Sequence, residues 1–106
     1  MFFRGDFLGE ELPDFLKVLK KKDPEYAENL LENYKKNFSD GALPAKTKTL
    51  IALALDAGND DVGGVKALTK QAKKLGATEN ELLEVVEVVE ETCGFQGLAT
   101  ATEALK

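Results

Sequence analysis

The chain has 106 residues and a net charge of −5, with 43% hydrophobic, 31% charged and 8% aromatic residues. This length suits a single domain over residues 1–106 with one modest core. The acidic balance excludes the phosphate backbone of a nucleic acid as a partner, because that binding needs a basic surface. Tryptophan is absent, so the core must be built mainly from Leu, Val and Ala, which indicates helices.

Two residue types that often carry chemistry are scarce. The chain has no histidine, which is the commonest metal ligand and the commonest general base, and Cys93 is its single cysteine. We therefore expect no metal, no cofactor and no intramolecular disulfide. No apolar run approaches the roughly 20 residues that cross a bilayer, and residues 1–12 carry acids where an export signal is apolar. These features predict a cytoplasmic protein without a membrane segment.

The first predicted helix covers residues 10–22. One face of it has apolar residues at the helical spacing i, i+3, i+4, i+7, namely Leu12, Phe15, Leu16 and Leu19. Asp23 and Pro24 are a favoured cap and a favoured first helical residue, so a second helix should start there. Its aromatic side, which we assign to the core or to a subunit contact, contains Tyr26, Leu30, Tyr34 and Phe38.

The next predicted helix begins at Pro44 and contains the segment 50–55, which is apolar on nearly every side. A helix that is apolar all round is expected to be buried all round, so we predict that this is the central element. Gly58 should end it, and Asn59 and Asp60 offer a cap for the helix that follows.

The fourth predicted helix ends at Gly76. Its expected inward face consists of Val62, Val65, Leu68, Ala72 and Leu75. Gly63 and Gly64 near its start cost roughly 1 kcal/mol each relative to alanine. They indicate either a frayed first turn or a close approach by another backbone or a ligand.

A valine-rich helix is predicted to follow, over residues 81–93. Thr78 and Glu81 fit a capping box, and glutamates at every third position from Glu81 to Glu90 form a polar line that a strand does not produce. Gly94 and Gly97 should loosen the chain before a last short helix over residues 98–105.

Several segments in this order resemble the carboxymuconolactone decarboxylase family, which includes the alkylhydroperoxidase D-like proteins. They are Asp23-Pro24-Glu25, residues 40–43 leading into 46–54, and residues 72–78 followed by an acidic and apolar helix. The resemblance covers about residues 23–105. It implies an all-α bundle of about six helices that assembles as a homotrimer or homohexamer, with peroxiredoxin-like or decarboxylase activity.

The redox members of that family carry Cys-x-x-Cys-x-x-x-His. Counting back from the glycine at 76, the resemblance places these positions at Asp61, Gly64 and Leu68, and it places a usual glutamate at Thr49. A dithiol cycle needs two thiols and a proton relay, and all of them are missing. A standard peroxidase cycle is therefore not expected, although these four positions could retain a small-molecule pocket.

Three residues are candidates for remaining chemistry. Asp61 could be a carboxylate base, or it could share the helix cap with Asp60. Glu90 could be an acid or a base if it faces an apolar pocket, although Glu90 and Glu91 point about 100° apart on a helix and form no dyad. Cys93 is expected to pack as a small hydrophobe; if it reacts, it can give only a sulfenic acid or an intermolecular disulfide.

Three functions stay open, and the sequence does not reveal a substrate. The first is an enzyme of altered chemistry, which requires an open pocket at Thr49, Asp61, Gly64 and Leu68 with a carboxylate converging on it. The second is a non-catalytic oligomeric binding or scaffold protein in which that site is filled. The third is a single-cysteine peroxidase that uses Cys93. Self-association is expected in each case, because Tyr26, Tyr34 and both flanks of the valine-rich helix exceed what one small core covers.

Overall fold

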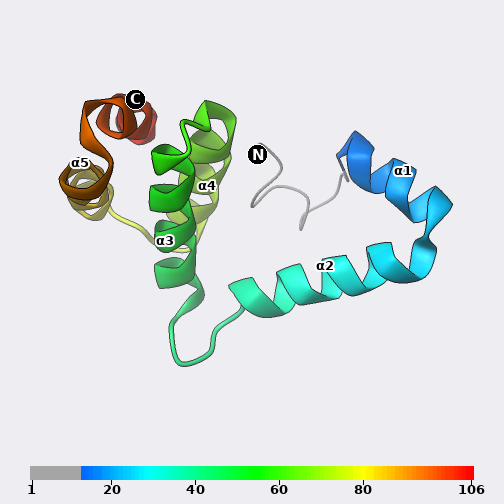
Figure 1. Ribbon diagram of the computed structural model, residues 1–106. Helices are drawn as coiled ribbons and strands as arrows, with labels where there is room; N and C mark the ends of the chain where they lie inside the picture. Colours follow the sequence, from blue (N-terminus) through cyan, green and yellow to red (C-terminus); the bar gives the residue numbers. More distant parts are fainter. Residues whose placement is uncertain (1–12) are drawn as a thin grey trace.

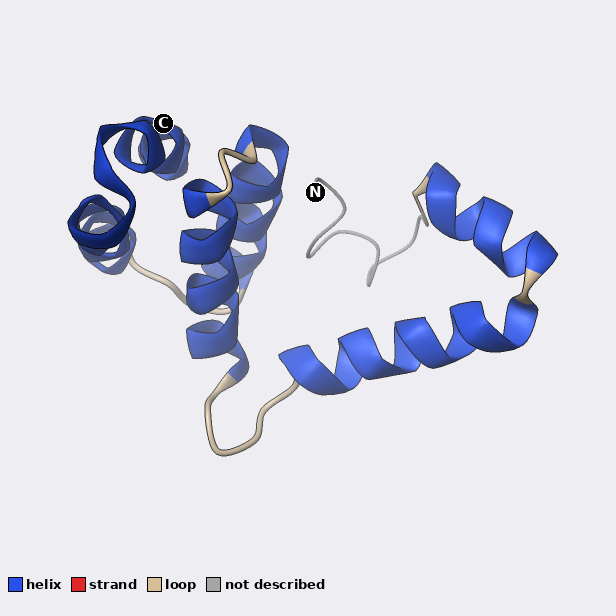
Figure 2. Cartoon of the chain, viewed as in Figure 1, coloured by secondary structure: helices blue, strands red, loops and turns tan. Residues whose placement is uncertain are grey.

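The computed structural model describes residues 13–106, and this part of the chain consists only of helices and their connections (Figures 1 and 2). The predicted all-α class is confirmed. In chain order the elements are α1 (Asp14–Lys22), α2 (Pro24–Phe38), α3 (Ala45–Gly58), α4 (Val62–Lys74), α5 (Glu79–Ala101) and the 3₁₀ helix η1 (Thr102–Leu105). The start of the predicted first helix, with Leu12, and the predicted absence of an export signal lie outside the described residues.

Helices α3, α4 and α5 form the bundle of the molecule, together with η1. Helix α3 packs against α4 on one side and against α5 on another (Figure 1). The buried core of this bundle is aliphatic and consists of Leu53, Ala57, Val65, Leu68, Leu82, Val86, Val89, Ala101 and Ala104. Leu, Val and Ala supply every member of it, as the composition predicts.

Helices α1 and α2 form an arm that projects to one side of the bundle (Figure 1). They pack on each other, and among the described bundle helices only α3 makes close backbone contact with α2. The arm has a small cluster of its own around the buried Leu16 and Tyr34. The radius of gyration is 14.3 Å, whereas a compact chain of this size has about 13 Å. The single chain is therefore somewhat extended.

The predicted helix ends are confirmed where capping chemistry defines them. The Asp23 carboxylate accepts a hydrogen bond from the Tyr26 backbone N–H at 3.2 Å. In the capping box, the Glu81 N–H donates to the Thr78 hydroxyl at 3.0 Å and the Thr78 N–H donates to the Glu81 carboxylate at 2.9 Å. Gly76 has a φ of 97° and ends α4 in the left-handed region, which glycine adopts without strain.

The prediction that the central helix is buried on all sides is wrong. In α3, Leu53 and Ala57 are fully buried, but Ile51 is 46% exposed and Leu55 is 64% exposed. Helices α4 and α5 cover only part of the circumference of α3. The apolar side chains of Ile51 and Leu55 on the remaining part are therefore exposed.

The aromatic side of α2 and the inward face of α4 are also less continuous than predicted. Tyr34 is buried and lies against Phe38, with ring centroids 4.7 Å apart, but Tyr26 is 56% exposed. On α4 the middle of the predicted face is buried, whereas Val62 and Leu75 at its two ends are exposed. Burial therefore stops near the ends of both helices, where neighbouring elements no longer cover them.

The loop between α3 and α4 differs from the prediction. Asn59 closes α3, and Asp61 alone caps α4. Asp60 has a φ of 59° and turns toward the far part of α5, where its carboxylate accepts hydrogen bonds from Gln96 at 3.0 Å and from the Thr100 hydroxyl. The prediction that Asp60 shares the cap is wrong because Asp60 instead joins the loop to α5.

The predicted break at the end of the valine-rich helix lies at Gly94, where φ is 69° and ψ is −165°. Gly97 is not a second break. It is helical and buried. A Cβ at Gly97 would lie 2.5 Å from the Cβ of Cys93 and 3.2 Å from a methyl of Val89, so this close packing needs a residue without a side chain. The predicted last helix does follow a break, but its bounds differ, because the helical segment after the kink at Gly94 runs to Ala101 and the 3₁₀ helix η1 (Thr102–Leu105) follows it.

Candidate functional site

The structure brings together two of the four positions, Thr49, Asp61, Gly64 and Leu68, that the resemblance aligns with the family's redox residues. Thr49, on α3, is buried and its hydroxyl donates to the Ala45 carbonyl at 2.9 Å. Leu68, on α4, is completely buried. Both line one cavity of about 90 Å³, whose wall consists of Tyr34, Phe38, Ala45, Thr49, Leu68, Gln71 and Leu75.

The other two positions, Asp61 and Gly64, do not line that cavity. The Asp61 carboxylate accepts a hydrogen bond from the Gly64 N–H at 2.9 Å, which confirms the expected cap at the start of α4. Seven residues, or about two helical turns, separate Asp61 from Leu68. The motif positions are thus divided between a helix cap and an interior wall.

The cavity beside Thr49 and Leu68 is small for a substrate. Ligand pockets commonly measure about 300–1,000 Å³, whereas 90 Å³ is the liquid volume of about three water molecules. Its lining includes no carboxylate and no cysteine. The polar side chains that line it are those of Tyr34, Thr49 and Gln71.

Cys93 is exposed, so the expectation that it packs as a buried hydrophobe is wrong. It lies on α5 one residue before the kink and lines an open depression of about 280 Å³ beside Leu55 and Gly58. Its sulfur is 3.4 Å from the Thr92 hydroxyl. A Cβ at Gly58 would lie 2.8 Å from that sulfur, so α3 admits the thiol only because position 58 has no side chain.

Three carboxylates, those of Asp60, Glu81 and Glu103, are stabilised as anions. Hydrogen bonds from Thr100 and then Gln96 lower the pKa of Asp60. The Thr78 backbone N–H, followed by the Lys46 ammonium, lowers the pKa of Glu81. A general acid near neutral pH needs a shift in the opposite direction.

The pKa of Glu103, in η1, is also lowered, because the Lys106 ammonium donates a hydrogen bond to its carboxylate. Glu90, the remaining candidate acid, is half-buried on α5. Neither residue lines the cavity that Thr49 and Leu68 share.

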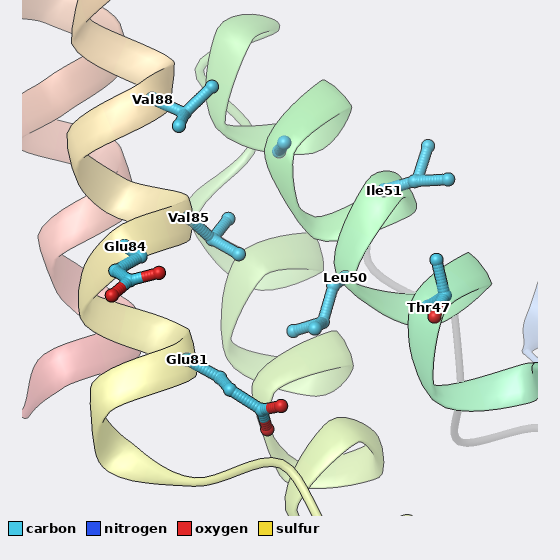
Figure 3. Close-up of a pocket in the computed structure, with 8 residues that line it drawn as sticks. Thr47, Leu50, Ile51, Glu81, Glu84, Val85 and Val88 are labelled. Atoms are coloured by element: carbon cyan, nitrogen blue, oxygen red, sulfur yellow. The ribbon is translucent and has the colours of Figure 1, made fainter.

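A larger depression lies between α3 and α5, and we call it the α3–α5 groove (Figure 3). It has a volume of about 380 Å³ and is lined by Thr47, Leu50, Ile51, Ala54, Glu81, Glu84, Val85 and Val88. Glu81 and Glu84 lie at one end of it along α5, and Val88 lies toward the other end. Lys46 pairs with Glu81 at 3.0 Å, which leaves Glu84 as the exposed acid of the groove.

The groove was only partly foreseen from the sequence. The valine-rich helix was expected to have apolar flanks, and Val88 is 61% exposed. The contribution of α3 was missed, because its apolar residues were all assigned to the interior. The composition of segment 50–55 indicates this contribution, because the segment has more apolar side chains than two neighbouring helices can cover.

Within residues 13–106, no helix is both long and apolar enough to cross a membrane. Over the same residues, no three His, Cys, Asp or Glu side chains gather closely enough to hold a metal ion.

The sequence profile of the carboxymuconolactone decarboxylase family matches residues 24–106. The chain therefore belongs to the carboxymuconolactone decarboxylase family. It is 34% identical over 90 residues to protein MJ1511 of Methanocaldococcus jannaschii, an alignment that covers 85% of this chain and 84% of the relative. It is 31% identical over 101 residues to protein MJ0742 of the same organism, with 94% and 93% of the two chains covered.

A solved structure supports the same assignment at the level of the fold. The crystal structure of apo-lpg0406, a carboxymuconolactone decarboxylase family protein from Legionella pneumophila, matches with a TM-score of 0.76 and 34% sequence identity. The match covers 86% of this chain and 81% of the Legionella protein. The fold implied by the sequence resemblance is thereby confirmed.

Proposed function

We propose that this chain is a homo-oligomeric binding or scaffold protein of the carboxymuconolactone decarboxylase family, located in the cytoplasm, that does not perform dithiol redox chemistry. The observation that carries this proposal is the fate of the four motif positions. Thr49 and Leu68 serve as interior wall, and Asp61 and Gly64 form a helix cap. Each of these four residues thus has a structural role that does not require it to take part in a reaction.

The electrostatics support the same proposal. A general acid or base that works near neutral pH needs a carboxyl whose pKa is raised toward 7. Asp60, Glu81 and Glu103 have lowered pKa values because hydrogen bonds and ammonium groups stabilise the charged form. Such carboxylates hold helices together and are poor proton donors.

Exposed apolar side chains support self-association. Ile51, Leu55 and Val88 lie on neighbouring helices and are between 46% and 64% exposed. A monomer that leaves such side chains in water loses the favourable free energy of burying them, about 25 cal/mol per Å² of apolar surface. A trimer or a hexamer would cover these side chains.

Two measurements test the two parts of the proposal. Light scattering coupled to size exclusion should give a mass that is a multiple of 11.5 kDa at micromolar concentration. Incubation with an organic hydroperoxide and an external dithiol should show no consumption above the protein-free rate. A monomer contradicts the oligomer, and hydroperoxide turnover contradicts the non-catalytic role.

The exposure of Cys93 favours one alternative, a single-cysteine peroxidase. Its thiolate would attack one oxygen of a hydroperoxide, the O–O bond would break, and the products would be a sulfenic acid and an alcohol. A first external thiol would then condense with the sulfenic acid to give a mixed disulfide and water, and a second would release the Cys93 thiol and leave as the external disulfide. Hydroperoxide consumption that Cys93→Ser abolishes and Thr92→Val preserves would establish this alternative; absence of consumption in the wild type eliminates it.

A further inference from the structure

The α3–α5 groove is open to solvent and changes character along its length. Ile51 and Val88 at its rim are 46% and 61% exposed. Pockets that hold small molecules usually bury 70–90% of the ligand, which an open groove of this kind does not do. An apolar groove on two packed helices instead suits the apolar face of another helix.

One face of helix α1 has apolar residues followed by a cation, and the groove has apolar residues followed by an acid. Phe15 and Val18 are exposed, with Val18 at 59%, and Lys22 follows four residues after Val18. Residues at the spacing i, i+3, i+7 lie on the same side of a helix. This face therefore runs from apolar to cationic over two turns, as the groove runs from Val88 to Glu84 (Figure 3).

The charges of the two helices are complementary. Helix α1 carries Lys17, Lys20, Lys21 and Lys22 against one acid, Asp14. Helix α5 carries six glutamates and no lysine or arginine. Opposite charges at the rim of an interface orient the partners and disfavour wrong pairings.

Within one chain, α1 does not reach this groove. It packs on α2, and α2 contacts the bundle through α3, so α1 and α5 lie on opposite sides of the molecule (Figure 1). A second copy can present its α1 where the first copy cannot. Each copy then offers one α1 and one groove, and such head-to-tail contacts close into a ring when the rotation permits.

We infer that the α3–α5 groove of one copy receives α1 of a second copy. This inference rests on the proposed self-association and specifies its interface. Val18 packs against the apolar end of the groove, near Val88. The lysines at the end of α1 lie beside Glu84.

The test measures the mass of variants by light scattering at micromolar concentration. Val18→Asp and Val88→Asp place a carboxylate in the apolar part of the contact and should reduce the mass to that of the monomer, 11.5 kDa. Glu84→Lys should also lower it, and so should the pair Lys21→Glu with Lys22→Glu. Combining the charge reversals of both helices in one chain should restore the wild-type mass, which shows that these surface variants fold.

Glu87→Lys is the matched control, because it makes the same charge change on the same helix outside the groove lining. It should leave the mass unchanged. A wild-type monomer overturns the proposed function and this interface together. A wild-type oligomer that retains its mass in Val18→Asp, Val88→Asp and Glu84→Lys overturns only the interface.

A small apolar molecule is the competing occupant, and anilinonaphthalene sulfonate fluorescence distinguishes it. The assembled wild type should give little dye signal in the groove, because α1 of the neighbouring copy covers it. A strong signal that Val88→Asp removes without a change in mass would mean that the groove stays open in the oligomer. That result overturns the inference in favour of a small-molecule site.

Discussion

The α3–α5 bundle and the α1–α2 arm are equally helical, but they differ in what they bury. The bundle encloses an aliphatic core drawn from four elements, whereas the buried apolar residues of the arm are Leu16, Ala27 and Tyr34. Helices of 9 and 15 residues have little stability in water without tertiary packing. We therefore expect the bundle to be the more stable of the two regions.

The largest expected effect comes from the bundle core. Leu53→Ala should lower the free energy of unfolding by about 2–5 kcal/mol, because a fully buried leucine leaves both lost apolar contacts and a cavity. Denaturant unfolding at a fixed protein concentration measures this value. Leu16→Ala in the arm should loosen amide protection in α1 and α2 more than it shifts the main transition; equal losses would remove the distinction between the two regions.

The kink in α5 should give the next largest effect. Gly94 combines a φ of 69° with a ψ of −165°, a region that is essentially restricted to glycine. Gly94→Ala should therefore cost about 1–3 kcal/mol, measured as the change in free energy of thermal unfolding. Gly41→Ala in the loop before α3 is the control and should stay within about 0.5 kcal/mol, because a Cβ there meets only the Nζ of Lys48, at an ordinary contact distance of 3.4 Å.

Two helix caps permit the same chemical change in both regions. Asp61 caps α4 in the bundle, and Asp23 caps α2 in the arm. Asp61→Ala should cost about 0.5–2 kcal/mol in global unfolding. Asp23→Ala should reduce mainly the helicity of the arm, seen by circular dichroism, with a smaller change in the global transition. A larger global loss for Asp23→Ala would show that the arm is part of the cooperative unit.

The smallest expected effect is a dependence on pH through Glu81. Its folded pKa is lowered below the ordinary value of 4.5, first by the Thr78 N–H and then by Lys46. A carboxyl with a lowered folded pKa stabilises the fold above its unfolded pKa and loses that contribution as pH falls through the folded value. Glu81→Gln should therefore narrow the difference in melting temperature between pH 7 and pH 3. An unchanged difference in melting temperature would mean that other carboxylates cause the dependence of stability on pH.

The local parts of the fold were predictable because short-range chemistry determines them. Asp23 before Pro24, Thr78 three residues before Glu81, and Gly76 after an amphipathic segment each define a helix end through hydrogen bonds within a few residues. Such signals need no knowledge of tertiary contacts. This is why the number and order of the helices follow from the sequence.

The site was less predictable because its contacts are long-range. Asp60 and Thr100 are forty residues apart, and no local pattern indicates that they meet. The apolar run 50–55 gives no indication of which side is covered by the same chain and which side is left open. Cys93 lies at the surface, whereas the residue type alone favours burial.

The position of Asp61 at the start of α4 has a consequence for the kind of side chain that this helix end stabilises. The first turn of a helix stabilises negative charge, and a cysteine thiolate benefits from it as a carboxylate does. Here that electrostatic field acts on the carboxylate that receives the Gly64 N–H. A cysteine at this position would receive the same backbone stabilisation that the Asp61 carboxylate receives, so we expect Asp61→Cys to give a thiol whose pKa is lower than that of an ordinary cysteine.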